Sequence, residues 1–154
     1  PKKGRSHVLR IIRELLEFRP KNKQTNIAEA LKFLSNVMKK KAIVFMLSDF
    51  IDENYQHNLK IASGKHDITG IRIFDKNEIE IPNLGVVQMV DQETGRSSLI
   101  NTASRKIRNN YAKNYQKQVE YFKDSCKKAG AGYLDCGLDE SYVKKLLGYF
   151  KQRA

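Results

Sequence analysis

Acidic and hydroxyl side chains lie at the ends of the three apolar segments that the sequence predicts to be parallel strands. They are Ser48, Asp49 and Asp52 after the first segment, Asp75 after the second, and Asp135 and Asp139 around the third. Ligands of open parallel sheets bind beyond the carboxyl ends of the strands, so we expect these oxygen atoms to gather at one edge. Carboxylate and hydroxyl oxygens are ligands of hard cations such as Mg²⁺. The pattern indicates either a divalent-cation site or a set of helix caps.

The two interpretations carry different weight along the chain. An aspartate between a strand and a helix commonly caps the helix by accepting a backbone hydrogen bond. For Asp49 the ligand and the cap are equally supported, whereas Asp52, Asp75 and Asp139 are predicted to be cap or turn residues. A Mg²⁺-dependent phosphoryl-transfer enzyme stays open as an alternative, since Asp49 with Asp52 or Asp75 would let two carboxylates share one metal.

Other residues with catalytic potential lack a specific pattern. His66 and Asp67 are adjacent at the start of a predicted strand, where neighbouring side chains point to opposite faces, so a structural role is predicted. Cys126 lies on the apolar stripe of a predicted helix, and Cys136 ends a strand without a histidine nearby. No G-x-S-x-G, P-loop, G-x-G-x-x-G or H-E-x-x-H motif occurs. We therefore predict a non-enzymatic protein with no catalytic residue.

Alternating apolar and amphipathic segments predict the elements that position these residues. Helices are expected over residues 7–18, 27–41 and 53–63, over some 25 residues after 101, and in a final segment that ends near 150. Strands are expected at 42–47, 67–74 and 133–136, with a short extended segment at 78–82. A β-hairpin is expected from strands at 85–91 and 96–101 around a turn at 92–95.

This element order is typical of an α/β fold with right-handed crossovers. We predict a Rossmann-like parallel sheet of about three strands flanked by helices, with a β-hairpin inserted over 79–101. Three strands are few for five helices, and the chain starts with Pro1 rather than methionine. The expectation is that residues 1–154 form the carboxyl-terminal part of a single domain whose first strands lie upstream.

The chain is strongly basic, with a formal net charge of +12. Basic residues concentrate in the first 41 residues and in 103–129, whereas residues 42–102 are net acidic. A nucleic-acid-binding module that uses residues 39–41 and 105–108 is a second alternative function. This alternative is disfavoured because the basic segments are predicted to be amphipathic helices. They lack the stacking aromatic residues and glycine-rich loops that are common in RNA-binding surfaces.

Targeting and redox signals are sparse. The longest uncharged apolar run covers residues 42–48, far short of the ~20 residues of a membrane helix. No apolar signal-peptide core follows the basic start, and two cysteines are too few for a disulfide framework. We expect a cytoplasmic protein without a membrane segment.

Several segments together resemble the bacterial domain of unknown function 58 family, whose members carry a von Willebrand factor type A-like domain. The matching segments are residues 1–10 (PKKGRSHVLR), 25–31 (TNIAEAL), 43–50 (IVFMLSDF), 66–67 (HD), 80–82 (EIP) and 91–95 (DQETG). The resemblance runs over essentially the whole chain. It implies a protein-binding or adaptor module that works with a MoxR-type AAA+ ATPase.

The resemblance also implies a metal-ion-dependent adhesion site at the carboxyl ends of the strands. Thr25 matches the family's threonine and Asp49 its aspartate, so these two residues are the predicted metal ligands. The third part, an Asp-x-Ser-x-Ser loop, is missing from these 154 residues, and the resemblance places it upstream of Pro1. We therefore expect no bound cofactor in this chain and Mg²⁺ or Mn²⁺ in the intact domain. Asn26 departs from the family's usual aspartate, which removes one nearby negative charge.

Two structural expectations follow. Thr25 and Asp49 are predicted to lie within about one ion-coordination shell of each other, consistent with ~2.1 Å Mg²⁺–oxygen bonds on either side, and a separation of their oxygen atoms above roughly 8 Å would contradict this. In the family's sheet order, strand 42–47 pairs with the absent central strand. Its edge is then bare, and we expect self-association through it or a cover from another element.

Overall fold

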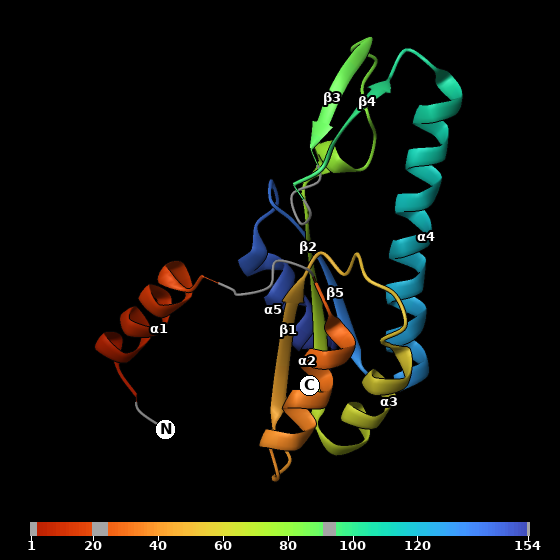
Figure 1. Ribbon diagram of the computed structural model, residues 1–154. Coiled ribbons are helices and arrows are strands. Elements are labelled where there is room, and N and C mark those ends of the chain that lie inside the picture. The colour runs from red at the N-terminus through yellow and green to blue at the C-terminus, as the bar shows by residue number, and fades with distance from the viewer. Residues whose placement is uncertain (1–2, 20–24, 91–94, 154) are drawn as a thin grey trace.

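The computed structural model describes residues 3–19, 25–90 and 95–153 (Figure 1). In chain order its elements are α1 (Arg5–Glu17), α2 (Ile27–Val37), β1 (Ile43–Ser48), α3 (Gln56–Lys65), β2 (Asp67–Phe74), the 3₁₀ helix η1 (Lys76–Glu78), β3 (Val86–Val90), β4 (Ser97–Asn101), α4 (Arg105–Ala129), β5 (Gly132–Gly137) and α5 (Tyr142–Arg153). The predicted α/β class is confirmed.

Strands β1, β2 and β5 form a parallel sheet in the order β1-β2-β5. Within it Phe45 pairs with Thr69, and Ile71 pairs with Leu134. The central strand β2 is buried from Ile68 to Arg72, as a strand covered on both faces must be. The antiparallel pair β3-β4 forms a separate hairpin, so both predicted sheet components are present.

One face of the sheet carries the main core. Helices α2, α3 and α4 turn their apolar sides onto it, and Leu31, Leu59 and Phe122 are at most 2% exposed. Phe122 stacks on Phe50 from the loop after β1, with ring centroids 4.1 Å apart. Burial of these apolar surfaces is the main force that holds the three helices in place.

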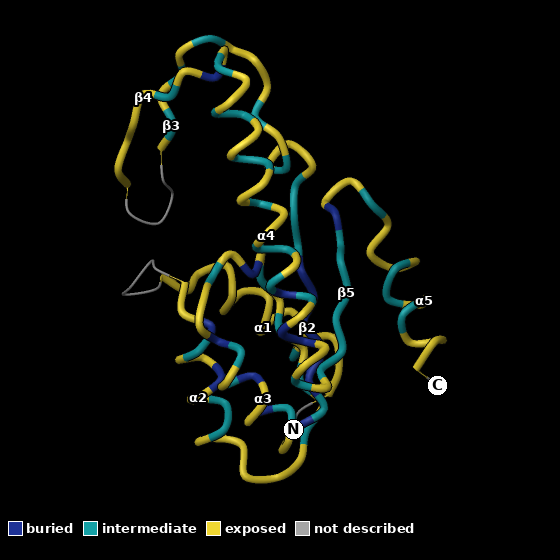
Figure 2. Tube along the Cα trace, turned by 90° about the vertical axis from the view of Figure 1, so that its right-hand side faces the viewer, coloured by how far each residue is buried: buried dark blue, intermediate teal, exposed yellow. Residues whose placement is uncertain are grey.

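Among the described elements, α5 alone covers the opposite face. In Figure 2 α4 and α5 lie on opposite sides of β5. Phe150 of α5 meets Phe45 of β1 edge to face at 5.9 Å. On either side of Phe45, Ile43 and Leu47 stay 70% and 63% exposed, because α5 does not reach across them.

Some predicted boundaries need correction. Helix α3 begins at Gln56 rather than 53, because Asn54 adopts a left-handed φ of 63° that cannot continue a helix. The expected extended segment 78–82 is not a strand: η1 ends there, and the hairpin strands start only at Val86. Of the predicted turn at 92–95, residues 92–94 lie outside the described residues.

Helix α1 is amphipathic as predicted, but none of its residues is buried. Figure 1 shows it standing apart from the sheet. Leu15 and Leu16 on its apolar stripe are 73% and 82% exposed. Within the described ranges no helix combines the length and apolar character that crossing a bilayer requires.

Candidate functional site

The loop after β1 presents Asp49 at the carboxyl edge of the sheet. Oδ1 of Asp49 accepts hydrogen bonds from the backbone N–H of Ile51 at 3.2 Å and from the hydroxyl of Ser48 at 3.3 Å. The Ser48 oxygen in turn accepts the N–H of Phe50 at 3.1 Å. One carboxylate oxygen of this exposed residue therefore organises the turn, and no described residue donates a hydrogen bond to the other.

Phe50 holds this loop in an uncommon backbone conformation. Its φ is 57°, a left-handed value that is costly for a bulky residue. The ring is 2% exposed and lies between Phe122 and Tyr55, so burial offsets the cost. Because Phe50 is fixed in the core, its neighbour Asp49 is held outward in a defined position.

Asp52 joins this loop to the start of α2. Its Oδ2 accepts the N–H of Ile27 at 2.7 Å, and its Oδ1 accepts the N–H of Glu53 at 2.7 Å. The predicted capping role of Asp52 is confirmed, although the helix it caps comes earlier in the chain. Thr25, the other predicted ligand, is exposed and lies two residues before Ile27. The two loops that carry Thr25 and Asp49 thus meet at the same edge, while the separation of their oxygen atoms stays a prediction.

These residues fit part of a divalent-cation site. Thr25 offers a hydroxyl and Asp49 a carboxylate oxygen, both of the type that Mg²⁺ and Mn²⁺ prefer. A complete site needs about six oxygen ligands. Among the described residues, no group of three His, Cys, Asp or Glu side chains is placed to hold a metal ion. The remaining ligands would have to be groups other than clustered His, Cys, Asp or Glu side chains of the described residues.

The other acidic candidates serve local structure. Asp75 forms a capping box with Glu78 at η1, which confirms its predicted role as a cap. Asp139 is paired with Lys76, and this hydrogen-bonded ion pair lowers the pKa of the Asp139 carboxyl. Ser141, rather than Asp139, directly precedes α5. Asp52 and Asp75 thus both use carboxylate oxygens in local hydrogen bonds.

His66, Asp67 and Cys126 lie away from this edge, whereas Cys136 lies near it, next to the last residue of β5. His66 is 3% exposed and follows the last turn of α3, where its N–H bonds to the carbonyl of Ala62. Asp67 forms a 2.8 Å ion pair with Arg153. Burial raises the pKa of Cys126 to about 12, consistent with the predicted packing role.

A buried arginine near the same edge was not among the sequence candidates. Arg72 on β2 is 6% exposed, and its Nε donates to Oδ1 of Asp135 on β5 at 2.7 Å. Its Nη1 donates to the hydroxyl of Tyr115 at 2.9 Å, and Lys123 reaches Oδ2 of Asp135 at 2.7 Å. Burial alone would raise the pKa of Asp135, but the hydrogen bonds from the two cations outweigh it and hold the pKa below its usual range. The sequence signal was an arginine within the otherwise apolar run 71–74 of a predicted strand.

The hairpin extends the molecule beyond the carboxyl ends of the sheet. Both Figure 1 and Figure 2 place β3 and β4 there, beside the start of α4. Thr102 fastens its base, since the Thr102 N–H and hydroxyl both donate to the carbonyl of Gly85 at 2.7 Å. One face of the hairpin exposes three apolar side chains to solvent: Val86, Val90 and Leu99 are 64%, 52% and 76% exposed, and they share this face with Gln88, Ser97 and Asn101.

The basic residues suggested for nucleic-acid binding do not form one free surface. Arg108 at the start of α4 donates from Nη1 to the carbonyls of Thr102 and Ala103 at 2.6 and 3.0 Å. Its guanidinium is thus engaged in fixing the hairpin base. Residues 39–41 follow α2 and lie near the start of β1, at the opposite end of the sheet.

Comparison with known families decides the affiliation of this fold. The family described as "Protein of unknown function DUF58" matches residues 1–121, which is well over half of the chain. The chain belongs to the DUF58 family. The match covers Thr25, Asp49 and the whole hairpin, whereas β5 and α5 of this DUF58 protein lie beyond it.

Individual relatives of this DUF58 protein are distant. An uncharacterized protein of Mycobacterium avium, MAV169, is 23% identical over 129 residues, covering 83% of this chain and 76% of the relative. The uncharacterized protein Rv1480 of Mycobacterium tuberculosis is 24% identical over 95 residues, so the match spans about a third of that relative's length (30%). The crystal structure of the conserved hypothetical protein BatB from Bacteroides thetaiotaomicron aligns with a TM-score of 0.41 at 14% identity, covering 84% of this chain and 58% of that one.

Proposed function

We propose that this DUF58 protein is a non-enzymatic protein-binding module with a von Willebrand A-like fold. The observation that carries the proposal is the exposure of three apolar side chains, Val86, Val90 and Leu99, on one face of the hairpin. An isolated two-stranded hairpin is marginally stable in water, so exposing valine and leucine on one is costly unless a partner covers them. The hairpin and the loops around Asp49 share one edge of the sheet and form a single surface for that partner.

A divalent ion would complete this surface in the intact domain. Thr25 and Asp49 would hold Mg²⁺ or Mn²⁺ together with the upstream Asp-x-Ser-x-Ser loop that the family resemblance implies. When bound, such an ion offers an open coordination position to an acidic side chain of the partner. The two residues of this chain act by presenting their oxygens from turns fixed by Phe50 and by the Asp52–Ile27 hydrogen bond.

The partner we propose is a MoxR-type AAA+ ATPase, on the basis of the family resemblance. A phosphoryl-transfer enzyme is less well supported, because the carboxylates of Asp52 and Asp75 accept hydrogen bonds from backbone N–H groups. A nucleic-acid-binding module is less well supported because Arg108 is committed to backbone carbonyls.

The test is calorimetric titration of the purified full-length protein with the MoxR-type ATPase of the same organism, in Mg²⁺. Leu99→Ser and Val86→Ser each remove apolar surface from the open face, and each is expected to weaken binding about tenfold, equivalent to ~1.4 kcal/mol. Ser98→Ala is the matched control, because Ser98 alternates with Leu99 and points to the other face of the hairpin. Equal affinity for both hairpin variants and wild type, or no binding by the wild type, would overturn the proposal.

A further inference from the structure

The outer edge of β5 is open along its length. β5 ends the sheet order β1-β2-β5, and its residues pair with β2 on one side only. Figure 2 looks onto this edge and shows β5 running between α4 and α5 with no described segment across it. All β5 residues except Gly137 are half-buried, since the helices cover the two faces but not the edge. Backbone N–H and C=O groups at such an edge are available to an added strand.

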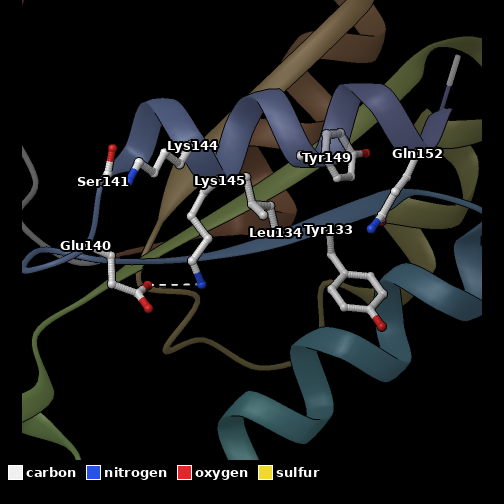
Figure 3. Close-up of a pocket in the computed structure, with 9 residues that line it drawn as sticks. Tyr133, Leu134, Glu140, Ser141, Lys144, Lys145, Tyr149 and Gln152 are labelled. Carbon is white, nitrogen blue, oxygen red and sulfur yellow. Dashed lines mark ion pairs between the residues drawn. The ribbon is translucent and has the colours of Figure 1, made fainter.

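A hollow of about 660 Å³ runs beside this edge, between β5 and α5 (Figure 3). Tyr133 and Leu134 line it from the strand, and Lys144, Lys145, Gly148 and Gln152 line it from the helix. Gly148 keeps the middle of the helix wall open: a Cβ there would have no heavy atom within 4 Å. The hollow is therefore wide enough for side chains that an added strand would direct toward α5.

Both ends of α5 are fastened, so the hollow is preformed. At the end of the helix, Arg153 pairs with Asp67 at 2.8 Å, and the hydroxyls of Tyr149 and Thr69 are 3.0 Å apart. Before its start, Glu140 accepts the N–H of Gly137 at 3.1 Å. Preformed sites lose little conformational entropy when a ligand binds.

The charges around the edge favour an acidic ligand. Among the described residues neither Lys144 nor Lys127 forms an ion pair, and Lys127 of α4 lies over the ring of Tyr133 at 6.0 Å. Lys145 is paired with Glu140 at 3.1 Å, the one acid that lines the hollow. Lys144 and Lys127 would repel a basic segment placed along this edge. An acidic segment of another protein would be attracted.

We propose that the open edge of β5 binds an extended, acidic segment of a partner protein by strand addition. Main-chain hydrogen bonds to β5 supply the pairing, and alternate side chains of the segment lie toward the α5 hollow and toward the α4 side. Acidic side chains of the segment face Lys144 on one side and Lys127 on the other. This site is separate from the carboxyl edge and goes beyond the function proposed above.

The probe is a short fluorescein-labelled peptide in which glutamate and valine alternate, and binding to the full-length protein is followed by anisotropy. We expect saturable binding that weakens with salt, because charge attraction is screened. Gly148→Leu fills the hollow, and Lys144→Glu reverses the unpaired charge. Each is expected to weaken binding about tenfold or more. Lys151→Glu on the same helix lies outside the hollow and is the matched control for charge.

A second peptide separates strand addition from simple charge attraction. It has the same charges but carries proline at alternate positions, which removes N–H donors. Loss of binding with this peptide, together with slower amide exchange over 132–137 in the presence of the first, supports the proposal. Equal binding of both peptides, an unaffected Gly148→Leu variant, or no binding of the acidic peptide would overturn it. None of these outcomes bears on hairpin binding to the ATPase, which uses another edge.

Discussion

The backbone N–H of Ile27 donates a 2.7 Å hydrogen bond to the carboxylate of Asp52, 25 residues further along the chain. The bond satisfies one of the N–H groups that the first turn of α2 leaves without an intrahelical acceptor. It also fixes the loop that carries Asp49 against the segment that carries Thr25. The side chain of Asn26 caps the same turn by accepting the N–H of Glu29 at 2.8 Å.

Removing the Asp52 carboxylate should destabilise α2 and the candidate edge together. We expect Asp52→Ala to lower the free energy of unfolding by about 1–2 kcal/mol, the usual cost of losing a cap. Asp52→Asn keeps an acceptor oxygen and should cost less. Urea denaturation measures both, with Glu53→Ala as an exposed control. If Asp52→Ala has the same free energy of unfolding as the wild type, the hydrogen bond does not contribute to stability.

The Arg72–Asp135 pair predicts acid sensitivity. Because the pKa of Asp135 is lowered in the folded protein, its stabilisation is fully present above the unfolded-state value of about 3.9 and is lost as the pH falls through the folded value. Asp135→Asn should cost about 2–3 kcal/mol at pH 7, below the ~3–5 of a fully buried pair because Asp135 is partly exposed.

The measurement is the unfolding free energy of wild type and Asp135→Asn at several pH values. The difference between them should shrink as the pH drops below about 4, where the wild-type carboxyl is itself protonated. Asp124→Asn removes an exposed ion pair with Lys128 and should change stability by less than about 1 kcal/mol. A difference independent of pH would mean that the charge of Asp135 is not what stabilises the fold.

Gly132 allows α5 to approach the sheet closely. A Cβ at this position would lie 1.8 Å from the Tyr149 hydroxyl and 3.1 Å from the Thr69 hydroxyl. Gly132→Ala should cost about 1–3 kcal/mol through overpacking. Adding Tyr149→Phe removes the clashing oxygen, so the double variant should lose less than the sum of the single variants.

Gly148→Ala is the matched control for Gly132→Ala in thermal unfolding. Gly148 lies in α5 with open space around it, and alanine there should stabilise the helix by about 0.5–1 kcal/mol. If Gly132→Ala and Gly148→Ala change the thermal stability by the same amount, the close approach of α5 is not the reason why a glycine is needed at position 132.

The free edge of β1 predicts self-association of the 154-residue chain. Among the described strands β1 pairs with β2 alone, and Leu47 is 63% exposed. Sedimentation should detect dimers or larger species, and Leu47→Lys should shift them toward monomer, because a charge on an edge strand opposes pairing. Leu138→Lys, at a position 69% exposed outside β1, should leave the association unchanged. A monomer at all concentrations would require another element to cover β1.

Metal binding should depend on residues of two separate segments. We expect Mg²⁺ or Mn²⁺ to bind the full-length protein in calorimetry and not the 154-residue chain. Thr25→Ala or Asp49→Ala should abolish the signal, whereas Asp75→Asn should retain it, because Asp75 is occupied as the cap of η1. Unchanged binding in both ligand variants would contradict the assigned pair.

Features set by short stretches of chain were predictable from sequence. The apolar segments that became β1, β2 and β5, the hairpin strands and the Asp75 cap all depend on neighbours within a few residues. Hydrophobic periodicity and capping chemistry act over that range. Helix boundaries were less predictable, as at α3, where the left-handed Asn54 delays the first turn until Gln56.

What the sequence by itself determined is therefore the α/β class, the order of its elements and the local caps. Only the tertiary structure decided that Asp52 caps an earlier helix, that Arg72 is neutralised by Asp135 63 residues away, and that β5 keeps an open edge beside Gly148. It also decided that the apolar stripe of α1 stays exposed. The physical reason is that these outcomes depend on sheet register and helix crossing, which join residues that share no local pattern.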